Sequence, residues 1–336
     1  MAPSNTEEFS RLDADSSLAD LVEHPAFKGF GARLLPGAYN VSDGAIPLHR
    51  VDSILPHHRH VDAAAVLGAL NHMIGEAGRG GTIFYDFHTE EQKRETQDKA
   101  STGLFFFRGK PGAPFAVICP GGSFRYVASL HEGFPLAVEL SKKGYNAFVL
   151  KYRVACAQAL KASGFLACED LAAALSYIFR NAEELAVARH DYSLWGASAG
   201  GWMADSTAAR GTAHFGGDDL PAPCALVMMY PVLTGFCGNV PPTFFAVSAT
   251  DEIITALVEQ RVKDMLEAGI DAACREYLAG HGFGLGTGTD AEGWLEHAVR
   301  FWRKHMGEHM KKRKGRAMAF LRQAVERGRV WKHFAK

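Results

Sequence analysis

Eight short apolar runs, rich in β-branched and aromatic residues, occur along the chain after Thr82. Each is four to six residues long, and turn-forming residues lie between them, as is typical of strands. Because most positions in a run are apolar, the pattern favours strands buried on both faces of a sheet. The predicted strands are Ile83–Phe87, Leu104–Arg108, Phe115–Cys119, Asn146–Leu150, Tyr192–Trp195, Ala225–Tyr230, Thr243–Ser248 and Ala272–Tyr277.

The segments between these runs have apolar residues at intervals of three and four, which is the spacing of an amphipathic helix. The predicted helices are Glu132–Lys143, Glu169–Asn181, Ser198–Ala209, Thr255–Ala268 and Glu292–Met306. This alternation predicts an α/β fold, with an eight-stranded, mostly parallel sheet covered by helices on both faces. The connection between the first two strands is too short for a crossover helix, so this pair is expected to be antiparallel.

Two terminal segments lie outside the alternating pattern, which occupies residues 81–308. Residues 1–80 are predicted to form an N-terminal helical extension. We expect it to be flexible up to about Ser17 and to contain one helix, Ala63–Glu76, capped by Asp62. Residues 309–336 are predicted to form a basic amphipathic helix. Its apolar positions at helical spacing are Ala317, Phe320, Leu321, Ala324 and Val325.

The net charge of −1 conceals an uneven distribution. From Lys311 to Lys336 the chain has ten Lys and Arg residues and one acidic residue, Glu326, whereas the rest has 26 basic and 36 acidic side chains. A basic tail on an acidic body favours docking of the tail onto the body or across a homodimer. Since no nucleic-acid motif accompanies the tail, we expect neither nucleic-acid binding nor stable membrane association.

The composition favours a globular protein of a reducing compartment. Hydrophobic residues make up 47% of the chain and charged residues 22%, which suits a large buried core. No apolar run reaches the ~20 residues that a membrane-spanning helix needs. Met1–Asp20 is acidic and lacks an apolar run, so a secretory signal is not expected. The six cysteines are dispersed, which favours reduced thiols and a cytoplasmic location.

The candidate chemistry starts from Gly196-Ala197-Ser198-Ala199-Gly200, a G-x-S-x-G motif. In this motif a nucleophilic serine occupies a sharp turn between a strand and a helix. A predicted strand precedes the motif and a predicted helix follows it, as the turn requires. So short a motif also occurs by chance, and a glycine-rich packing turn is the alternative. We predict that Ser198 is a nucleophile.

A serine nucleophile of this kind is followed along the chain by an acid and then by a histidine. Asp251 follows the predicted strand Thr243–Ser248, with Glu252 as the competing acid. His281 lies between glycines in the loop after the last predicted strand, from which its imidazole can reach Ser198. The alternatives are a helix cap for Asp251 and a solvated loop position for His281. We predict Ser198, His281 and Asp251 as a catalytic triad.

Attack on an ester places negative charge on the carbonyl oxygen, and backbone N–H groups can stabilise it. The segment Pro120-Gly121-Gly122-Ser123 follows a predicted strand and offers such groups on small residues. We predict an oxyanion hole made by the N–H groups of Gly122, Ser123 and Ala199. An ordinary turn is the alternative for the two glycines.

Taken together, these motifs resemble the acetyl-esterase and carboxylesterase branch of the α/β-hydrolases. The resemblance rests on Pro120–Phe124, Gly144–Arg153, Gly196–Gly201, Asp251 and Gly280–Phe283, and it covers roughly Thr82 to Met306. It implies an α/β-hydrolase catalytic domain that hydrolyses short acyl esters, sometimes acetyl groups on sugars, without a cofactor. Lipase-like relatives have His-Gly-Gly-Gly where this chain has Pro120-Gly121-Gly122-Ser123, so the oxyanion donors cannot be carried over directly.

Three further features have weaker chemical interpretations. The run His57-His58-Arg59-His60 contains metal-ligating side chains, but adjacent residues rarely converge on one ion, so no metal site is predicted. His131-Glu132 lies near the predicted oxyanion loop and either shapes the pocket or places an acid at a helix start. Tyr152 is the predicted substrate-binding residue, with simple packing as its alternative.

The sequence thus predicts a serine esterase that hydrolyses short-chain, acetyl-like esters through an acyl-enzyme intermediate. The segment between Tyr152 and Glu169 is too short for a large lid, which favours small ester substrates over long-chain lipids. The alternatives are a carbohydrate acetyl esterase or a peptidase of the same fold. A non-catalytic binding protein is disfavoured, because no member of the predicted triad is missing.

Overall fold

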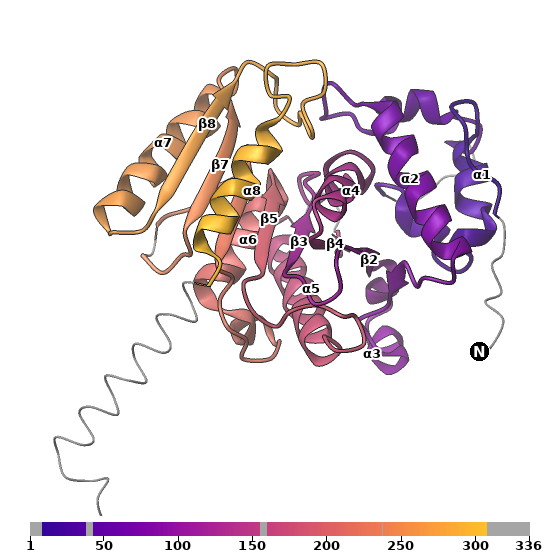
Figure 1. Ribbon diagram of the computed structural model, residues 1–336, viewed down its shortest axis with the longest axis horizontal. Helices are drawn as coiled ribbons and strands as arrows, with labels where there is room; N and C mark the ends of the chain where they lie inside the picture. The colour runs from indigo at the N-terminus through magenta and orange to yellow at the C-terminus, as the bar shows by residue number, and fades with distance from the viewer. Residues whose placement is uncertain (1–8, 38–42, 155–159, 237, 308–336) are drawn as a thin grey trace, which may run out of the picture.

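A single sheet of eight strands forms the centre of the protein (Figure 1). The computed structural model describes residues 9–37, 43–154, 160–236 and 238–307. The strand order is β1-β2-β4-β3-β5-β6-β7-β8. The strands are β1 (Phe84–Tyr85), β2 (Gly103–Phe107), β3 (Phe115–Cys119), β4 (Asn146–Lys151), β5 (Ser193–Ala197), β6 (Ala225–Met229), β7 (Thr243–Ser248) and β8 (Ala272–Tyr277).

The pairing of the strands confirms the predicted fold class. β2 pairs antiparallel with β1 and with β4, whereas the other neighbouring strands are parallel. The predicted eight-stranded, mostly parallel sheet and its antiparallel first pair are therefore correct. The first strand is shorter than the predicted Ile83–Phe87, because this edge strand pairs only through Phe84 and Tyr85 with β2.

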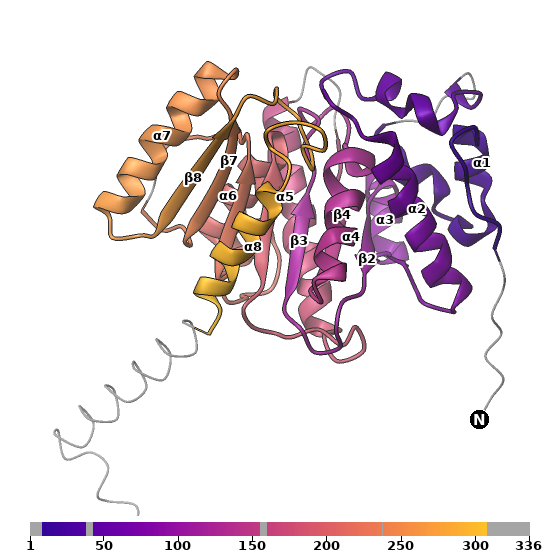
Figure 2. The same ribbon diagram turned by 45° about the horizontal axis from the view of Figure 1, so that its top comes forward.

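Helices cover both faces of the sheet, as Figure 2 shows from a second direction. Buried side chains of α2, α4 and α8 belong to the core on one face, and those of α5, α6 and α7 belong to the core on the other. The helices are α1 (Leu18–Glu23), α2 (Ala63–Gly78), α3 (Glu90–Glu95), α4 (Phe134–Lys142), α5 (Leu160–Arg180), α6 (Ala199–Arg210), α7 (Glu252–Glu267) and α8 (Trp294–His305).

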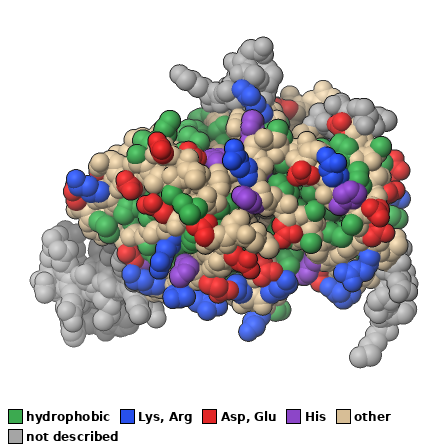
Figure 3. All heavy atoms as spheres, turned by 90° about the horizontal axis from the view of Figure 1, so that it is seen from above, with side chains coloured by type: hydrophobic (Ala, Val, Ile, Leu, Met, Phe, Trp, Pro, Cys, Tyr) green, Lys and Arg blue, Asp and Glu red, His purple; other side chains and the backbone are tan. Residues whose placement is uncertain are grey.

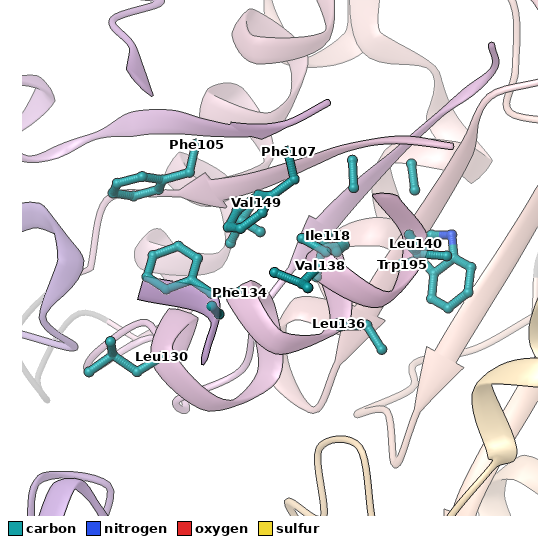
Figure 4. Packing of buried hydrophobic residues seen from close by; sticks show 14 of the residues in the cluster. Phe105, Phe107, Ile118, Leu130, Phe134, Leu136, Val138, Leu140, Val149 and Trp195 are labelled. Atoms are coloured by element: carbon teal, nitrogen blue, oxygen red, sulfur yellow. The ribbon is translucent and has the colours of Figure 1, made fainter. Parts of the chain in front are cut away.

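The two cores follow from the alternation of side chains along each strand. On β2, Phe105 and Phe107 face α4, whereas Leu104 and Phe106 face the opposite core. Figure 4 shows the first core, where the ring of Phe134 on α4 lies edge-on to Phe105 at 4.9 Å between centroids. Every position of β2 to β7 is therefore buried, which explains why most of these strands are apolar runs in the sequence, whereas the edge strands β1 and β8 are partly exposed.

Helix α5 begins earlier than the predicted start at Glu169. Glu169 and Asp170 resemble the acids of a helix start, but both are partners of Arg153, whose Nη2 lies 2.9 Å from a carboxylate oxygen of each. The earlier turns pack against α6, since a Cβ on Gly164 would lie 2.8 Å from the ring of Trp202. Tertiary contacts therefore extend this helix beyond its sequence signal.

The first described residues of the N-terminal extension pack against its own helix α2. The backbone of Leu12 exchanges two hydrogen bonds with the Asn71 side chain of α2, at 3.0 and 2.9 Å. The expectation of a flexible start is therefore wrong for residues 9–17, because the buried Asn71 amide holds the Leu12 backbone and the Ser16 oxygen accepts from Leu48 N at 2.8 Å. Asp62 caps α2 as predicted, and its Oδ1 accepts a hydrogen bond from Ala65 N at 2.9 Å.

Lys151, at the end of β4, connects the sheet to this extension through hydrogen bonds. Its buried ammonium group donates to the carbonyl oxygens of Leu35 and Pro36, and the Pro36 oxygen also accepts from Val127 N at 2.8 Å. No carboxylate among the described residues pairs with it. Burial therefore lowers the pKa of Lys151 to about 7.

From the burial of Lys151 we predict an unusual dependence of the protein's stability on pH. The unfolded chain holds the proton on this amine up to about pH 10, whereas the folded chain releases it near pH 7. The free energy of unfolding of the wild type, relative to Lys151→Met, is therefore expected to rise between pH 7 and 9 by up to about 1.4 kcal/mol per pH unit. Urea unfolding of both proteins measures this difference. The exposed Lys263→Met is the control, and a difference that stays flat with pH would contradict the prediction.

Some predicted features lie outside the described residues. These are the basic tail at 309–336, which follows α8 at the end of the chain, and the short segment 155–159 before α5. In the described ranges, no helix is long and apolar enough to span a membrane. The face seen in Figure 3 carries acidic and basic side chains interspersed with apolar ones.

Candidate active site

Ser198 lies at the turn between β5 and α6. Its backbone has φ 49° and ψ −116°, a conformation that non-glycine residues rarely adopt. The flanking glycines permit this turn. A Cβ on Gly196 would lie 2.5 Å from the Gly200 oxygen, and a Cβ on Gly200 would lie 2.0 Å from the Cys119 oxygen. Both glycines of the G-x-S-x-G motif are therefore required by backbone packing around the serine.

The predicted triad residues are joined by hydrogen bonds. His281 Nε2 lies 3.0 Å from Ser198 Oγ, and His281 Nδ1 lies 2.6 Å from Asp251 Oδ2. A carboxylate only accepts hydrogen bonds, so Nδ1 carries a proton and Nε2 of the neutral ring can accept the proton of Ser198. Glu252, the competing acid, is exposed in the first turn of α7. The structure thus brings Asp251, and not its neighbour, to the imidazole.

The loop that carries two of the predicted oxyanion donors, Gly122 and Ser123, passes beside the same serine. A Cβ on Gly121 would lie 2.9 Å from Ser198 Cβ, which shows how closely the loop after β3 approaches. In the described chain, the N–H groups of Gly122, Ser123 and Ala199 donate to no acceptor. The N–H of Gly121 is occupied, because it donates to Glu132 Oε2 at 2.6 Å. The three predicted donors therefore remain the candidates for the oxyanion hole, whereas Gly121 N does not.

Tyr152 does not contact this opening. The side chain is buried, and its hydroxyl donates to the Pro120 oxygen at 2.7 Å. This geometry favours the packing alternative over the predicted role in substrate binding. The hydroxyl holds the start of the oxyanion loop, because a phenol that is committed to a backbone carbonyl has no proton left for a substrate.

Glu132, predicted either to shape the pocket or to place an acid at a helix start, is a central residue of this region whose partners the sequence did not reveal. It lies in a π-helical turn, Ser129–Gly133, and is fully buried. Burial alone would raise its pKa, but the neighbouring His58 lowers the pKa of Glu132 to about 2. Its Oε1 accepts from the Tyr230 hydroxyl at 2.8 Å and lies 3.1 Å from His58 Nε2. Glu132 is therefore a buried carboxylate whose bond to Gly121 N in the loop after β3 favours the predicted pocket-shaping role.

Tyr230 is a residue that sequence reasoning missed. It follows β6, and its ring lies 4.8 Å from that of His281. Burial raises the pKa of Tyr230 well above its ordinary value, so the phenol keeps its proton and donates it to Glu132. No motif in the sequence marks this residue, because its partners come from distant parts of the chain.

The run His57–His60 does not converge on one point. The His58 side chain is only 4% exposed and faces Glu132, whereas His57 and His60 are exposed. The described residues contain no group of three or more His, Cys, Asp or Glu side chains that could hold a metal ion. The structure therefore gives His58 a partner of a different kind, a buried carboxylate.

Comparisons with known proteins agree with the observed fold. Residues 108–220 match the family model BD-FAE. A thermophilic esterase from the Planctomycetes species Thermogutta terrifontis superposes with a TM-score of 0.55 at 18% sequence identity, covering 67% of this chain and 95% of that chain. The protein therefore has the α/β-hydrolase fold.

Two solved structures from Lactobacillus plantarum share the fold. A putative carboxylesterase superposes with a TM-score of 0.53 at 21% identity, covering 61% of this chain and 93% of that one. The carboxylesterase Cest-2923 gives a TM-score of 0.51 at 21% identity, covering 60% and 92%. No curated protein sequence matches the chain significantly.

Proposed function

We propose that this protein is a serine esterase that hydrolyses short-chain acyl esters, with Ser198, His281 and Asp251 as its catalytic triad. The observation that carries the proposal is the pair of hydrogen bonds from the His281 ring, 3.0 Å to Ser198 Oγ and 2.6 Å to Asp251 Oδ2. A serine on a strained strand-to-helix turn with such partners can act as a nucleophile at neutral pH.

The proposed reaction has two halves. His281 Nε2 takes the proton of Ser198 while the serine oxygen bonds to the ester carbonyl carbon, and Asp251 stabilises the resulting imidazolium. The N–H groups of Gly122, Ser123 and Ala199 bind the oxyanion. The carbon–alkoxide bond breaks, and the alcohol leaves with the proton from His281. Water then attacks the acyl-enzyme in the same way and releases the carboxylic acid.

Short acyl groups suit the residues that flank Ser198. Phe124, in the oxyanion loop, and Trp202, in the first turn of α6, meet edge to face at 5.9 Å. Two bulky rings on the segments that flank Ser198 support a preference for small acyl groups. The Thermogutta terrifontis esterase, which shares the fold, was solved with propionate bound. That ligand is a short-chain acid of the size proposed here.

A substrate panel tests this proposal. We expect kcat/KM to be highest for p-nitrophenyl acetate or butyrate and at least about tenfold lower for the dodecanoate. Methylenes of the long acyl chain that do not fit beside the serine contribute no binding energy to the transition state. Acetylated xylose in the same panel distinguishes a carbohydrate esterase from a general one. An aminoacyl p-nitroanilide tests the peptidase alternative. Preferred turnover of the anilide or of the long-chain ester would contradict the proposal.

A further inference from the structure

The segment that precedes α2 lies beside the loop that follows β8, where His281 is found (Figures 1 and 2). A Cβ on Gly282 would lie 3.0 Å from His58 Cδ2 and 3.2 Å from the His57 oxygen. A Cβ on Gly280 would lie 3.0 Å from Arg59 Cδ. The glycines on both sides of His281 therefore make room for this part of the N-terminal extension.

His58 is the residue of that segment which reaches the interior. Its Nε2 lies 3.1 Å from Glu132 Oε1, and its Nδ1 lies 3.2 Å from the Tyr126 hydroxyl. The Glu132 carboxylate can only accept, so Nε2 of His58 donates to it. The side chains of His58 and Glu132 are 4% and 0% exposed, so water does not replace this contact.

Glu132 in turn holds two loops of the candidate active site. Its Oε2 accepts from Gly121 N, in the oxyanion loop, at 2.6 Å. Its Oε1 accepts from the Tyr230 hydroxyl, which itself accepts from Gly284 N at 3.2 Å, three residues after His281. One buried carboxylate therefore connects the loop after β3 with the loop after β8.

A second histidine fastens the same loop. His131 Nε2 lies 2.8 Å from the Gly282 oxygen and donates to it, and burial lowers the pKa of His131, so the ring is neutral. The rings of His58 and His131 lie 5.5 Å apart. The His281 loop is thus attached at Gly282 and at Gly284, and the second attachment runs through Glu132.

We propose that His58 is a positioning residue of the active site, which acts through Glu132 to hold both the oxyanion loop and the His281 loop in their reactive arrangement. This inference rests on the proposed esterase function. A buried carboxylate that loses one donor takes up a proton or turns towards another partner. Either change alters its bonds to Gly121 N and the Tyr230 hydroxyl. Through His58, the N-terminal extension therefore supports the two loops of the candidate active site.

Replacement of His58 tests the inference. In His58→Ala, kcat for p-nitrophenyl acetate is expected to fall about 10- to 100-fold with little change in KM, because the loops are misplaced while substrate contacts remain. His58→Gln retains an N–H donor of similar reach and is expected to recover most of the activity. Labelling of Ser198 by a fluorophosphonate should slow in parallel with kcat, since this reaction also depends on the oxyanion loop and the His281 loop. The matched control is His60→Asn, an exposed residue of the same segment at φ 56°, which asparagine tolerates.

Thermal unfolding of each variant separates positioning from stability. His58→Asn, whose side chain is too short to reach Glu132, provides a second test if the alanine variant loses cooperative unfolding. A double-mutant cycle with Glu132→Gln should be non-additive in kcat, because both changes break one contact. A folded His58→Ala variant with wild-type kcat would overturn the positioning role. So would losses in kcat that are additive between His58→Ala and Glu132→Gln. The esterase function is tested separately. The wild type should hydrolyse the ester, and Ser198→Ala should not.

Discussion

Ser198→Ala is expected to lower kcat for p-nitrophenyl acetate by about 10⁴- to 10⁶-fold, to the level of residual oxyanion binding. The serine oxygen is the atom that bonds to the acyl carbon, so no acyl-enzyme can form without it. Alanine is close to serine in size and fits the same strained turn. The variant loses the hydrogen bond between Ser198 Oγ and His281 Nε2. The melting temperature should therefore change little, and fluorophosphonate labelling should disappear.

A matched serine variant controls this experiment. Ser101→Ala removes an exposed hydroxyl on the connection between β1 and β2, far along the chain from the candidate site. It should retain both turnover and labelling. Retention of turnover in Ser198→Ala would remove this serine from the mechanism, and loss of labelling in Ser101→Ala would show that the probe reports another site.

Asp251→Asn is expected to lower kcat by about 10⁴-fold while the fold is retained. The carboxylate at 2.6 Å requires a proton on His281 Nδ1, which leaves Nε2 as an acceptor towards Ser198. An asparagine amide can donate to Nδ1 instead, and the proton then resides on Nε2, where it blocks the serine. The imidazolium formed during attack would also lose its counter-charge. Steady-state kinetics and circular dichroism measure the two effects.

The neighbouring acid supplies the control for this variant. Glu252→Gln removes a carboxylate one residue away, on an exposed position at the start of α7. It should retain wild-type kcat. A large loss in Glu252→Gln together with a small loss in Asp251→Asn would assign the role of the acid to Glu252.

Part of this chain lies outside the region that it shares with the solved structures named above. These structures cover 60–67% of this chain while covering 92–95% of their own lengths. Residues 9–78 contact the rest of the chain where Leu35 and Pro36 accept from Lys151, and where His58 meets Glu132. Because one of these contacts reaches Glu132, a truncation that removes the extension should impair catalysis as well as stability.

Periodicity in the sequence was sufficient to predict the sheet and most helices. Strands such as β3 and β7 are apolar at nearly every position because both faces are covered, so their ends are visible without coordinates. The start of α5 was mispredicted because Glu169 and Asp170 bind Arg153 instead of capping a helix. Packing of Gly164 against Trp202 then decides where the helix begins.

The sequence by itself determined the order of strands and helices along the chain and proposed Ser198, Asp251 and His281 as chemical partners, because these depend on local patterns and on chain order. Only the tertiary structure decided that Tyr152 is committed to Pro120 and that Glu132 is a buried carboxylate. It also decided that His58, Tyr230 and Gly121 meet on that acid. Such contacts join residues that are distant in sequence, and their energies depend on burial, which no local pattern encodes.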